Sequence, residues 1–367
     1  MATVLTVENS LEGRLLFAVP KNYTFQSWTL DTWTEPPLTD HGTPANHVEG
    51  RLQGPCLNLL EGADIQFRRE SRLDIALVKN LPIALIFLPA ADIPTFVGEG
   101  RVDLGITGTD QVQEHDAGVR SVNRARRGST STFNPAEDGS KPRGCETVMD
   151  LGFGGCRLQV QVPQKGAFAS SADLVGKNIG TSFVHLAEEY FARLEQEQDA
   201  AANGGDAPAP GSRKLRTNII ELSGSVEAAC ALGVADGIVD LVESGETMRA
   251  AGLKAIDTVV ESSAILIKSK SPSNPELVEL IASRIRGVIT AQRYILCQYN
   301  IERSKLAAAT AITPGKRAPT ITNIDQEGAV AVSSMVEKKK MAIVMDELTK
   351  IGATDILCLA IQNARSN

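Results

Sequence analysis

The sequence predicts an α/β protein with two α/β lobes and a C-terminal ferredoxin-like module. Two patterns support the lobes: short apolar runs typical of buried strands, and segments of helical spacing that alternate with them. A third pattern, the order of elements from residue 290 onward, supports the module. The length of 367 residues is too great for one ordinary domain, so several folding units are expected.

The first lobe is expected to hold four strands and an intervening helix. Ile93, Phe96 and Val97 lie at helical spacing, and Asp92 stands where a helix N-cap is expected. Four short apolar runs predict the strands, at residues 13–20, 74–78, 84–88 and 102–107.

The second lobe repeats this alternation of strand and helix. Helical segments are expected at 184–194 and 245–251, each directly after a strand. The chain is then expected to return to the first lobe through 255–268. The predicted strands of the second lobe are 157–162, 177–182, 219–222 and 237–242.

The tail has a different order of elements. It runs strand, helix, strand, strand, helix, strand, which is the ferredoxin-like order. Such a module often pairs with copies of itself or binds a small ligand, but the order alone shows neither. The six ranges are 294–299, 304–310, 319–324, 330–334, 337–351 and 355–361.

Composition excludes several classes of protein. A formal net charge of −7 argues against a general nucleic-acid binder, which needs an excess of Lys and Arg on one face. The 6 cysteines are scattered without a CxxC motif, so neither a zinc site nor a disulfide framework is expected. The longest apolar run, 83–91, is too short to cross a membrane, and the N-terminus lacks a secretory signal pattern. A cytoplasmic location is therefore expected.

Three polar stretches interrupt the pattern and are interpreted as insertions. Residues 120–143 and 196–214 are expected to form loops, because they are rich in Gly, Pro, Ser, Ala or charged residues. Residues 22–48 hold both tryptophans and several prolines without clear periodicity. We expect each of the three to lie outside the regular elements.

The strongest candidate site is the run from Ala235 to Met248. Asp236 and Asp240 flank or belong to a predicted strand, and a Gly-centred turn opens the next helix. Backbone N–H groups at a helix start suit a phosphate, and carboxylates beside it suit ribose hydroxyls or a magnesium ion. The pattern fits an ordinary strand-to-helix turn equally well when taken alone. The turn residues are Glu243, Ser244, Gly245, Glu246 and Thr247.

Two further turns of this kind are expected in the same lobe. One is the pair Thr181 and Ser182. The carboxyl ends of parallel strands meet at one edge of a sheet, where open α/β sheets bind ligands, and Asp92 would face the same cleft. A single turn of this kind is common in any α/β protein. The other turn consists of Ser223, Gly224, Ser225, Val226 and Glu227.

Basic residues near the first-lobe strands could face phosphates across a cleft. The candidates are Lys21, Arg51, Arg72 and Lys79, although plain surface charge explains any one of them considered singly. The 4 histidines form no triad pattern, and no GxSxG or activated-cysteine motif is present. Cys156 reads as a small buried apolar residue.

The sequence resembles the long form of ATP phosphoribosyltransferase, a family that catalyses the first step of histidine biosynthesis. Each matching segment is weak alone, and together they are specific. The resemblance covers nearly the whole chain outside the three insertions. The matching segments are Asp92-Ile-Pro, 100–108, Leu151-Gly-Phe-Gly-Gly-Cys-Arg-Leu158, Ser223-Gly-Ser-Val-Glu-Ala-Ala229, 236–252 and Thr313-Pro-Gly-Lys-Arg-Ala-Pro-Thr320.

The resemblance implies a fold and a reaction. It implies two periplasmic-binding-protein-like lobes, with lobe I at 1–112 and 255–289 and lobe II at 113–254, and an ACT-like regulatory domain at 290–367. The implied reaction is attack of adenine N1 of ATP on phosphoribosyl pyrophosphate (PRPP), with release of pyrophosphate. Positioning, a metal ion and cationic side chains would do most of that chemistry.

The resemblance also implies site residues and partners. Residues 243–247 would hold the 5-phosphate of PRPP, and Asp236 and Asp240 would lie near its ribose. Lys21, Arg51 and Arg72 would lie on the nucleotide and pyrophosphate side. Mg²⁺ would be held through the pyrophosphate, with Asp240 as a candidate ligand. Histidine is implied as an inhibitor that binds the tail, and a homo-hexamer as the assembly; no nucleic-acid or membrane partner is expected.

The sequence departs from the family pattern at one place. The family has a continuous Lys-x-Gly-Arg-Leu, whereas here Lys21 and Gly50-Arg51-Leu52 are separated. Removing residues 22–48 restores the pattern, so we interpret them as an inserted segment, of which an intron translated in frame is one origin. Two alternatives stay open: a non-catalytic bilobal protein that binds small anions, and a silent regulatory homologue.

Overall fold

The computed structural model describes residues 11–21, 51–68, 73–128, 143–202 and 215–365. Within 124–128 it gives the backbone alone. The predicted insertion at 22–48 lies outside these residues. The described part divides into two compact units: the first holds residues up to 56, 68–77 and 82–274, and the second holds 57–67, 78–81 and 275 onward.

The first sheet belongs to the first unit and has six strands, in the order β2-β3-β1-β4-β11-β5. β1 pairs in parallel with β3 and β4. The antiparallel pairs are β2 with β3, β11 with β4, and the edge strand β5 with β11. The central strands are nearly continuous apolar runs because both of their faces are covered. The bounds are β1 Leu15–Pro20, β2 Ile75–Leu77, β3 Ile83–Leu88, β4 Leu104–Gly108, β5 Cys145–Asp150 and β11 Ala264–Ser269.

The second sheet has five strands, in the order β10-β6-β9-β7-β8. β7 pairs in parallel with β8 and β9. β6 pairs antiparallel with β9, and β10 pairs antiparallel with β6. One face packs against the apolar side of the helix α5 (Val184–Ala202), where Ala187 and Phe191 join the core together with Phe183, the residue just before the helix. The bounds are β6 Cys156–Pro163, β7 Asn178–Thr181, β8 Asn218–Glu221, β9 Gly237–Val242 and β10 Leu253–Ser262.

Helices connect these strands. Asp92 is the N-cap residue of α3, as predicted, but its side chain makes no capping hydrogen bond. The helices of this part of the chain are α2 Gln53–Gly62, α3 Ile93–Gly98, α4 Thr109–Gly128, α5 Val184–Ala202, α6 Ala228–Ala231 and α7 Glu246–Ala250, with the 3₁₀ helix η1 at Ser171–Leu174.

The chain passes between the two sheets twice, which confirms the prediction of two α/β lobes. It leaves the first sheet after β5 and returns to it at β11. The strand membership differs from the predicted lobe ranges in two places: β5 was expected in lobe II and belongs to the first sheet, and most of β10 was expected in lobe I and belongs to the second. Strand pairing is set by distant partners, so local patterns do not reveal it.

Two predicted loops are partly helical. Residues 120–128 continue α4 and residues 196–202 continue α5, so the loop interpretation was wrong for these residues. The end of α5 consists of Glu, Gln, Asp and Ala, of which all but Asp favour helices. Arg120 also donates a bidentate pair of hydrogen bonds to Glu189, at 3.0 and 2.9 Å, which joins the two helices. The remaining parts, 129–142 and 203–214, lie outside the described residues.

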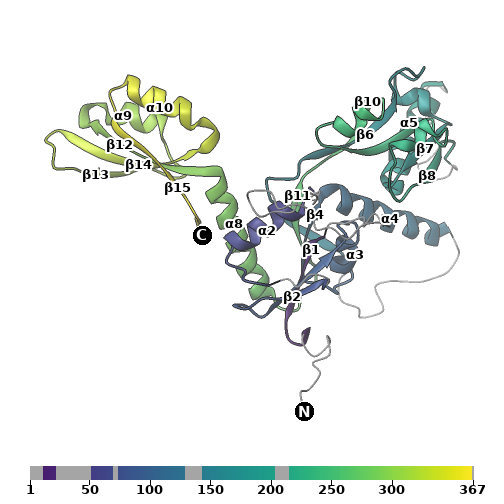
Figure 1. Ribbon diagram of the computed structural model, residues 1–367, viewed down its shortest axis with the longest axis horizontal. Coiled ribbons are helices and arrows are strands. Elements are labelled where there is room, and N and C mark those ends of the chain that lie inside the picture. Colours follow the sequence, from purple (N-terminus) through teal and green to yellow (C-terminus); the bar gives the residue numbers. More distant parts are fainter. Residues whose placement is uncertain (1–10, 22–50, 69–72, 129–142, 203–214, 366–367) are drawn as a thin grey trace, which may run out of the picture. The chain divides into compact units, whose positions relative to one another are not determined.

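The second unit contains a four-stranded antiparallel sheet in the order β13-β14-β12-β15. Helices α9 and α10 cover one face of it, and their side chains fill the module's core (Figure 1). This is the ferredoxin-like arrangement predicted from the sequence. The bounds are α8 Pro275–Arg293, β12 Tyr294–Glu302, η2 Arg303–Lys305, α9 Leu306–Ile312, β13 Thr320–Asn323, β14 Ala329–Glu337, η3 Lys338–Lys340, α10 Met341–Lys350 and β15 Thr354–Ala360.

No helix in the described residues is both long and apolar enough to cross a membrane.

Candidate active site

The turn at 243–247 joins β9 to α7. Gly245 adopts φ +76°, a left-handed conformation that favours glycine. A Cβ at this position would also lie 2.9 Å from Nη1 of Arg249. Ser244 Oγ accepts a hydrogen bond from the backbone N–H of Glu246, at 3.3 Å. The first N–H groups of a helix have no carbonyl partner within that helix, so this turn presents donors to a bound anion.

The turn forms one wall of a cavity of about 260 Å³. Residues 241–248 line it together with Arg51 and Cys156. The structure therefore brings Arg51, from the predicted basic group, to all five predicted turn residues. Because α7 has only five residues, its dipole is small, and the attraction for an anion comes mainly from the turn N–H groups, the hydroxyls and Arg51.

Arg51 is held in place by a network that the sequence did not reveal. Its Nη1 donates to the carbonyl oxygen of Gly154 at 3.1 Å and contacts Sγ of Cys156. Its Nη2 lies 3.7 Å from Oδ1 of Asp110, whose side chain is fully buried. The Ser262 hydroxyl donates to Asp110 Oδ1 and accepts a hydrogen bond from the Asp110 backbone N–H, at 3.0 Å.

This network explains two local sequence features. A Cβ at Gly108 would overlap the Asp110 carboxylate, so the close turn from β4 into α4 requires glycine there. Cys156 is buried, as predicted, and burial raises the pKa of its thiol despite the lowering effect of Arg51. Cys156 is therefore a packing partner of Arg51 rather than a thiolate nucleophile.

Asp240 lies on β9, on the same face as Val242, which lines the cavity. Burial, and to a smaller extent the nearby Glu227 carboxylate, raise the pKa of its carboxyl to about 6. A hydrogen bond from the Leu241 backbone N–H to Oδ1, at 2.8 Å, opposes this shift. Asp240 and Glu227 thus come together as two acidic groups beside the 243–247 turn.

Asp236 lies at the opposite end of β9 from the turn. Its Oδ2 accepts a hydrogen bond from the Asn178 backbone N–H at 2.9 Å, and its own N–H donates to Asn178 O at 2.8 Å. Six residues of strand at about 3.3 Å each separate it from the turn. The carboxylate therefore ties the start of β9 to the start of β7, and the structure does not bring it to the turn; its place near the ribose stays a prediction.

The turn from Ser223 to Glu227 follows β8. Ser223, Gly224 and Ser225 are exposed, and Ser225 has φ +49°, a conformation that is uncommon outside glycine. Glu227 is the N-cap residue of α6 but makes no capping hydrogen bond with its side chain. An exposed turn in a costly backbone conformation next to Asp240 is consistent with a ligand contact.

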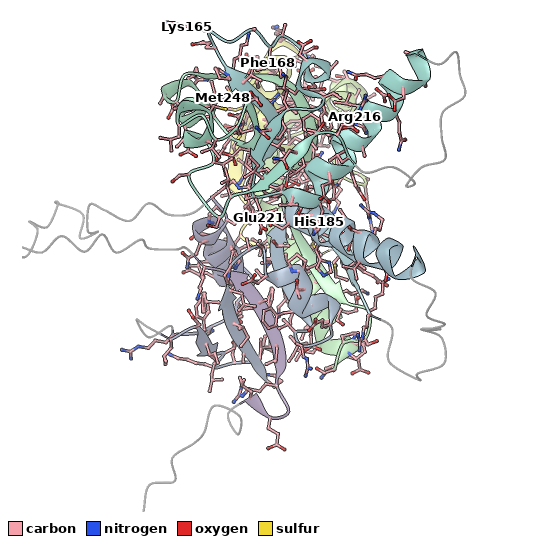
Figure 2. The ribbon with its side chains drawn as sticks, turned by 90° about the vertical axis from the view of Figure 1, so that its right-hand side faces the viewer. Lys165, Phe168, His185, Arg216, Glu221 and Met248 are labelled. Carbon is pink, nitrogen blue, oxygen red and sulfur yellow. The ribbon has the colours of Figure 1, made fainter. Side chains whose placement is uncertain are left out.

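Thr181 and Ser182 follow β7 but have different environments. Thr181 is fully buried; its hydroxyl donates to Val239 O at 2.7 Å and accepts from the Phe183 N–H at 2.9 Å. The Thr181 hydroxyl therefore makes its hydrogen bonds within the fold. Ser182 is exposed and lines a second cavity of about 480 Å³, next to His185 in the first turn of α5. Figure 2 labels His185 in α5 and Met248 in α7.

The second cavity contains polar residues that the sequence did not single out. Glu114 and His115 from α4 and His185 from α5 line it. Both carboxylate oxygens of Glu114 accept backbone N–H bonds at the start of α5, at 2.8 Å each, so Glu114 caps that helix. Ala91 and Thr95 also line it, which places the exposed Asp92 near its edge.

The other predicted basic residues are not among those that line the Arg51 cavity. Lys21, at the end of β1, donates from Nζ to Asp74 Oδ2 at 2.7 Å, and its backbone N–H donates to Leu88 O. Arg72 lies outside the described residues. Of the predicted cations, the structure thus brings Arg51 to the turn.

Curated relatives match nearly the whole chain. The ATP phosphoribosyltransferase of Yarrowia lipolytica is 52% identical over 357 residues, which cover 97% of this chain and 98% of the relative. Those of Schizosaccharomyces pombe and Saccharomyces cerevisiae are 49% and 48% identical, with the same coverage.

Two solved structures show more distant similarity. The ATP phosphoribosyl transferase (HisG:HisZ) complex from Thermotoga maritima is 19% identical and covers 74% of this chain and 96% of that chain, with a TM-score of 0.48. The substrate binding protein of an amino acid ABC transporter is 13% identical, covering 75% of this chain and 92% of that chain, with a TM-score of 0.39.

Family models match the chain in two consecutive segments. The model for the C-terminal domain of HisG matches residues 291–363. The model described as HisG, ATP phosphoribosyltransferase, matches residues 89–287, which is more than half of the chain. Together with relatives of about half identity along nearly the full length, these matches show that the chain belongs to the ATP phosphoribosyltransferase family.

Proposed function

We propose that this chain condenses ATP with PRPP to give N1-(5-phosphoribosyl)-ATP and pyrophosphate, the first step of histidine biosynthesis. The single observation that carries this proposal is the cavity in which Arg51 faces the 243–247 turn. The family membership supports the same reaction. Neither of the non-catalytic alternatives is favoured by these relatives.

The residues that line the cavity, and the neighbouring Asp240, have different roles in binding PRPP. The turn N–H groups and the hydroxyls of Ser244 and Thr247 hold the 5-phosphate, because an anion needs several donors that converge. Asp240 accepts hydrogen bonds from the ribose hydroxyls. Arg51 supplies positive charge, which stabilises the negative charge that develops on the departing pyrophosphate.

Asp110 and Ser262 act on the reaction through Arg51. An Arg side chain loses conformational entropy when it is fixed in one rotamer. Because the buried Asp110 carboxylate already holds Arg51, this entropy is lost before the substrate binds. The attack by adenine N1 needs no protein nucleophile, and the buried Cys156 thiol, with its raised pKa, is not suited to be one.

Mg²⁺ is proposed as the metal of this reaction. Among the described residues, no group of three or more His, Cys, Asp or Glu side chains could hold a metal ion. The donor set therefore fits a cation held mainly by pyrophosphate oxygens, with Asp240 as the one candidate protein ligand. When bound, Mg²⁺ would neutralise charge on the leaving pyrophosphate.

The direct test is formation of phosphoribosyl-ATP by the full chain. Purified protein is mixed with ATP, PRPP and Mg²⁺, and the product is followed by absorbance and identified by mass. We expect product that requires both substrates and the metal. A folded, PRPP-binding chain that makes no product would favour the silent homologue instead.

Three further properties are proposed from the family alone: inhibition by histidine through the C-terminal module, a homo-hexamer, and a cytoplasmic location. Histidine is expected to inhibit the full chain and not a chain that ends before residue 290. The mass of the assembly in solution checks the hexamer, and imaging of the tagged protein in cells checks the location. Each of the three can fail without affecting the transfer reaction.

A further inference from the structure

Two cysteines of the C-terminal module stand directly opposite each other. Cys297 on the inner strand β12 pairs with Cys358 on the edge strand β15. The pair lies within four consecutive residue pairs in register, from Ile295 and Ala360 to Gln298 and Leu357. Directly opposite residues of antiparallel strands point to the same face, with Cβ atoms about 4.5–5.5 Å apart. A disulfide needs about 3.5–4.5 Å between Cβ atoms, so a small strand movement suffices.

The two thiols are also in contact. The Cys297 and Cys358 side chains lie close enough for Cys358 to raise the pKa of the Cys297 thiol, and Cys358 Sγ donates to Met345 Sδ of α10 at 3.6 Å. Among the described residues, no cluster of His, Cys, Asp and Glu fits a metal ion, so the pair is not part of such a site.

The two positions differ in access to solvent. Cys297 has no exposed surface and belongs to the core under α9 and α10. Cys358 is exposed. Burial raises the pKa of the Cys297 thiol to about 11, so it stays protonated in the reduced protein. An oxidant from solution therefore meets Cys358 first, and Cys297 is positioned to react second.

We propose that Cys297 and Cys358 form a redox-active dithiol that low-molecular-weight disulfides oxidise to a cross-strand disulfide. The Cys358 thiolate attacks one sulfur of the small disulfide and forms a mixed disulfide, and one small thiolate leaves. The Cys297 sulfur then attacks Cys358 Sγ and expels the second small thiolate, which takes up the Cys297 proton. The net change converts two protein thiols and one small disulfide into one protein disulfide and two small thiols.

The bond would join the edge strand β15 to its neighbour β12. Within the described residues β15 pairs with no other strand, and all but one of its seven residues are exposed. Closing the long loop between the cysteines restricts the unfolded chain and opposes local opening of β15. Oxidation is expected to raise the melting temperature of the module by about 5 °C or more, and reduction is expected to reverse the shift.

The test uses the full chain incubated with oxidised glutathione and then digested with trypsin after free thiols are blocked. Cys297 and Cys358 fall on separate tryptic peptides, 294–303 and 351–365, which each contain one cysteine. We expect these peptides to be linked in mass spectra and to separate after reduction. Cys358→Ser and Cys297→Ala remove the link and the thermal shift, whereas the matched control Cys230→Ser keeps both.

Two outcomes would overturn the proposal. One is a glutathione adduct that stays on Cys358 while Cys297 remains free for blocking. The other is a bond between the Cys358 residues of two chains. Because Cys297→Ala changes a buried side chain, the exposed Cys358→Ser variant keeps the test valid if the first variant does not fold. The proposal does not depend on the transfer reaction.

Discussion

Arg51 and Asp110 show what residue-level reasoning can and cannot find. Arg51 could be chosen from the sequence because a cation beside a predicted phosphate site has a chemical purpose. Asp110 and Ser262 could not, because they are far apart in the chain. They meet because β4, which ends just before Asp110, pairs with β11, which begins just after Ser262. Asp236 and Asp240 could not be told apart from the sequence, because a carboxylate before a strand and one within it look alike; only the structure shows that Asp236 lies at the far end of β9 from the turn.

The Arg51 network leads to a prediction for Asp110→Asn. The substitution keeps the shape but removes the charge that faces Arg51, so we expect kcat/KM to fall about 10- to 100-fold. The free energy of unfolding should fall by about 1–3 kcal/mol, because a buried polar network loses its charged member. Steady-state kinetics and denaturant unfolding measure the two effects. The control is Asp116→Asn, whose side chain is 52% exposed; equal losses in both variants would refute the network's role.

The ionised Asp240 carboxylate is expected to lower the stability of the fold. Its folded-state pKa, about 6, lies above the ordinary value, so its stabilising contribution is complete below about pH 4 and is lost as the pH rises through 6. Above that pH the buried charge costs stability. The free energy of unfolding of Asp240→Asn should therefore be about 1–2 kcal/mol greater than that of the unchanged chain at pH 7.5. The difference should shrink at pH 4.

The same substitution should impair turnover. The ionised Asp240 carboxylate is the form that accepts ribose hydroxyls, so kcat/KM for PRPP should decline as the pH falls through about 6. In Asp240→Asn the rate should be low and this decline absent. A variant with unchanged kinetics would show that Asp240 does not contact the ribose.

At the scale of elements, the strands and the order of elements in the tail could be predicted from the apolar runs. Strands of a buried core are apolar along their length, so a short stretch of sequence is enough to locate them. Two features had no local signature of this kind. The sheet membership of β5 and β10 depends on pairing across the chain. The ends of α4 and α5 are polar surface helices, in which composition alone resembles a loop.

The β9–α7 connection gives a prediction with a matched control. Gly245 and Gly252 both have positive φ, +76° and +70°, but a Cβ at Gly252 would meet nothing within 4 Å. Both Gly→Ala variants should lose about 1 kcal/mol of stability from backbone strain. Only Gly245→Ala should raise the KM for PRPP, because its Cβ also displaces Arg249 and the turn. Equal kinetics in the two variants would contradict the role of this turn.

At the scale of the whole molecule, the departure at residues 22–48 is the open question that the sequence raised. The segment lies outside the described residues, between Lys21 and the active-site Arg51. We expect deletion of 22–48 to raise kcat at least several-fold, because it joins Lys21 to Glu49-Gly50-Arg51 as in the family pattern. Turnover of both forms is compared directly. Equal turnover would show that the segment is tolerated, and a spliced message that retains its codons would exclude the intron origin.

The central claim is that PRPP binds at the 243–247 turn opposite Arg51. The most direct measurement is the pair of Michaelis constants, for PRPP and for ATP, in Thr247→Leu. The bulkier side chain removes a hydroxyl donor and fills the cavity, so the KM for PRPP should rise about 10-fold or more while the KM for ATP changes little. The exposed Thr349→Leu variant in α10 should leave both constants unchanged. A change in the ATP constant alone would contradict the assignment.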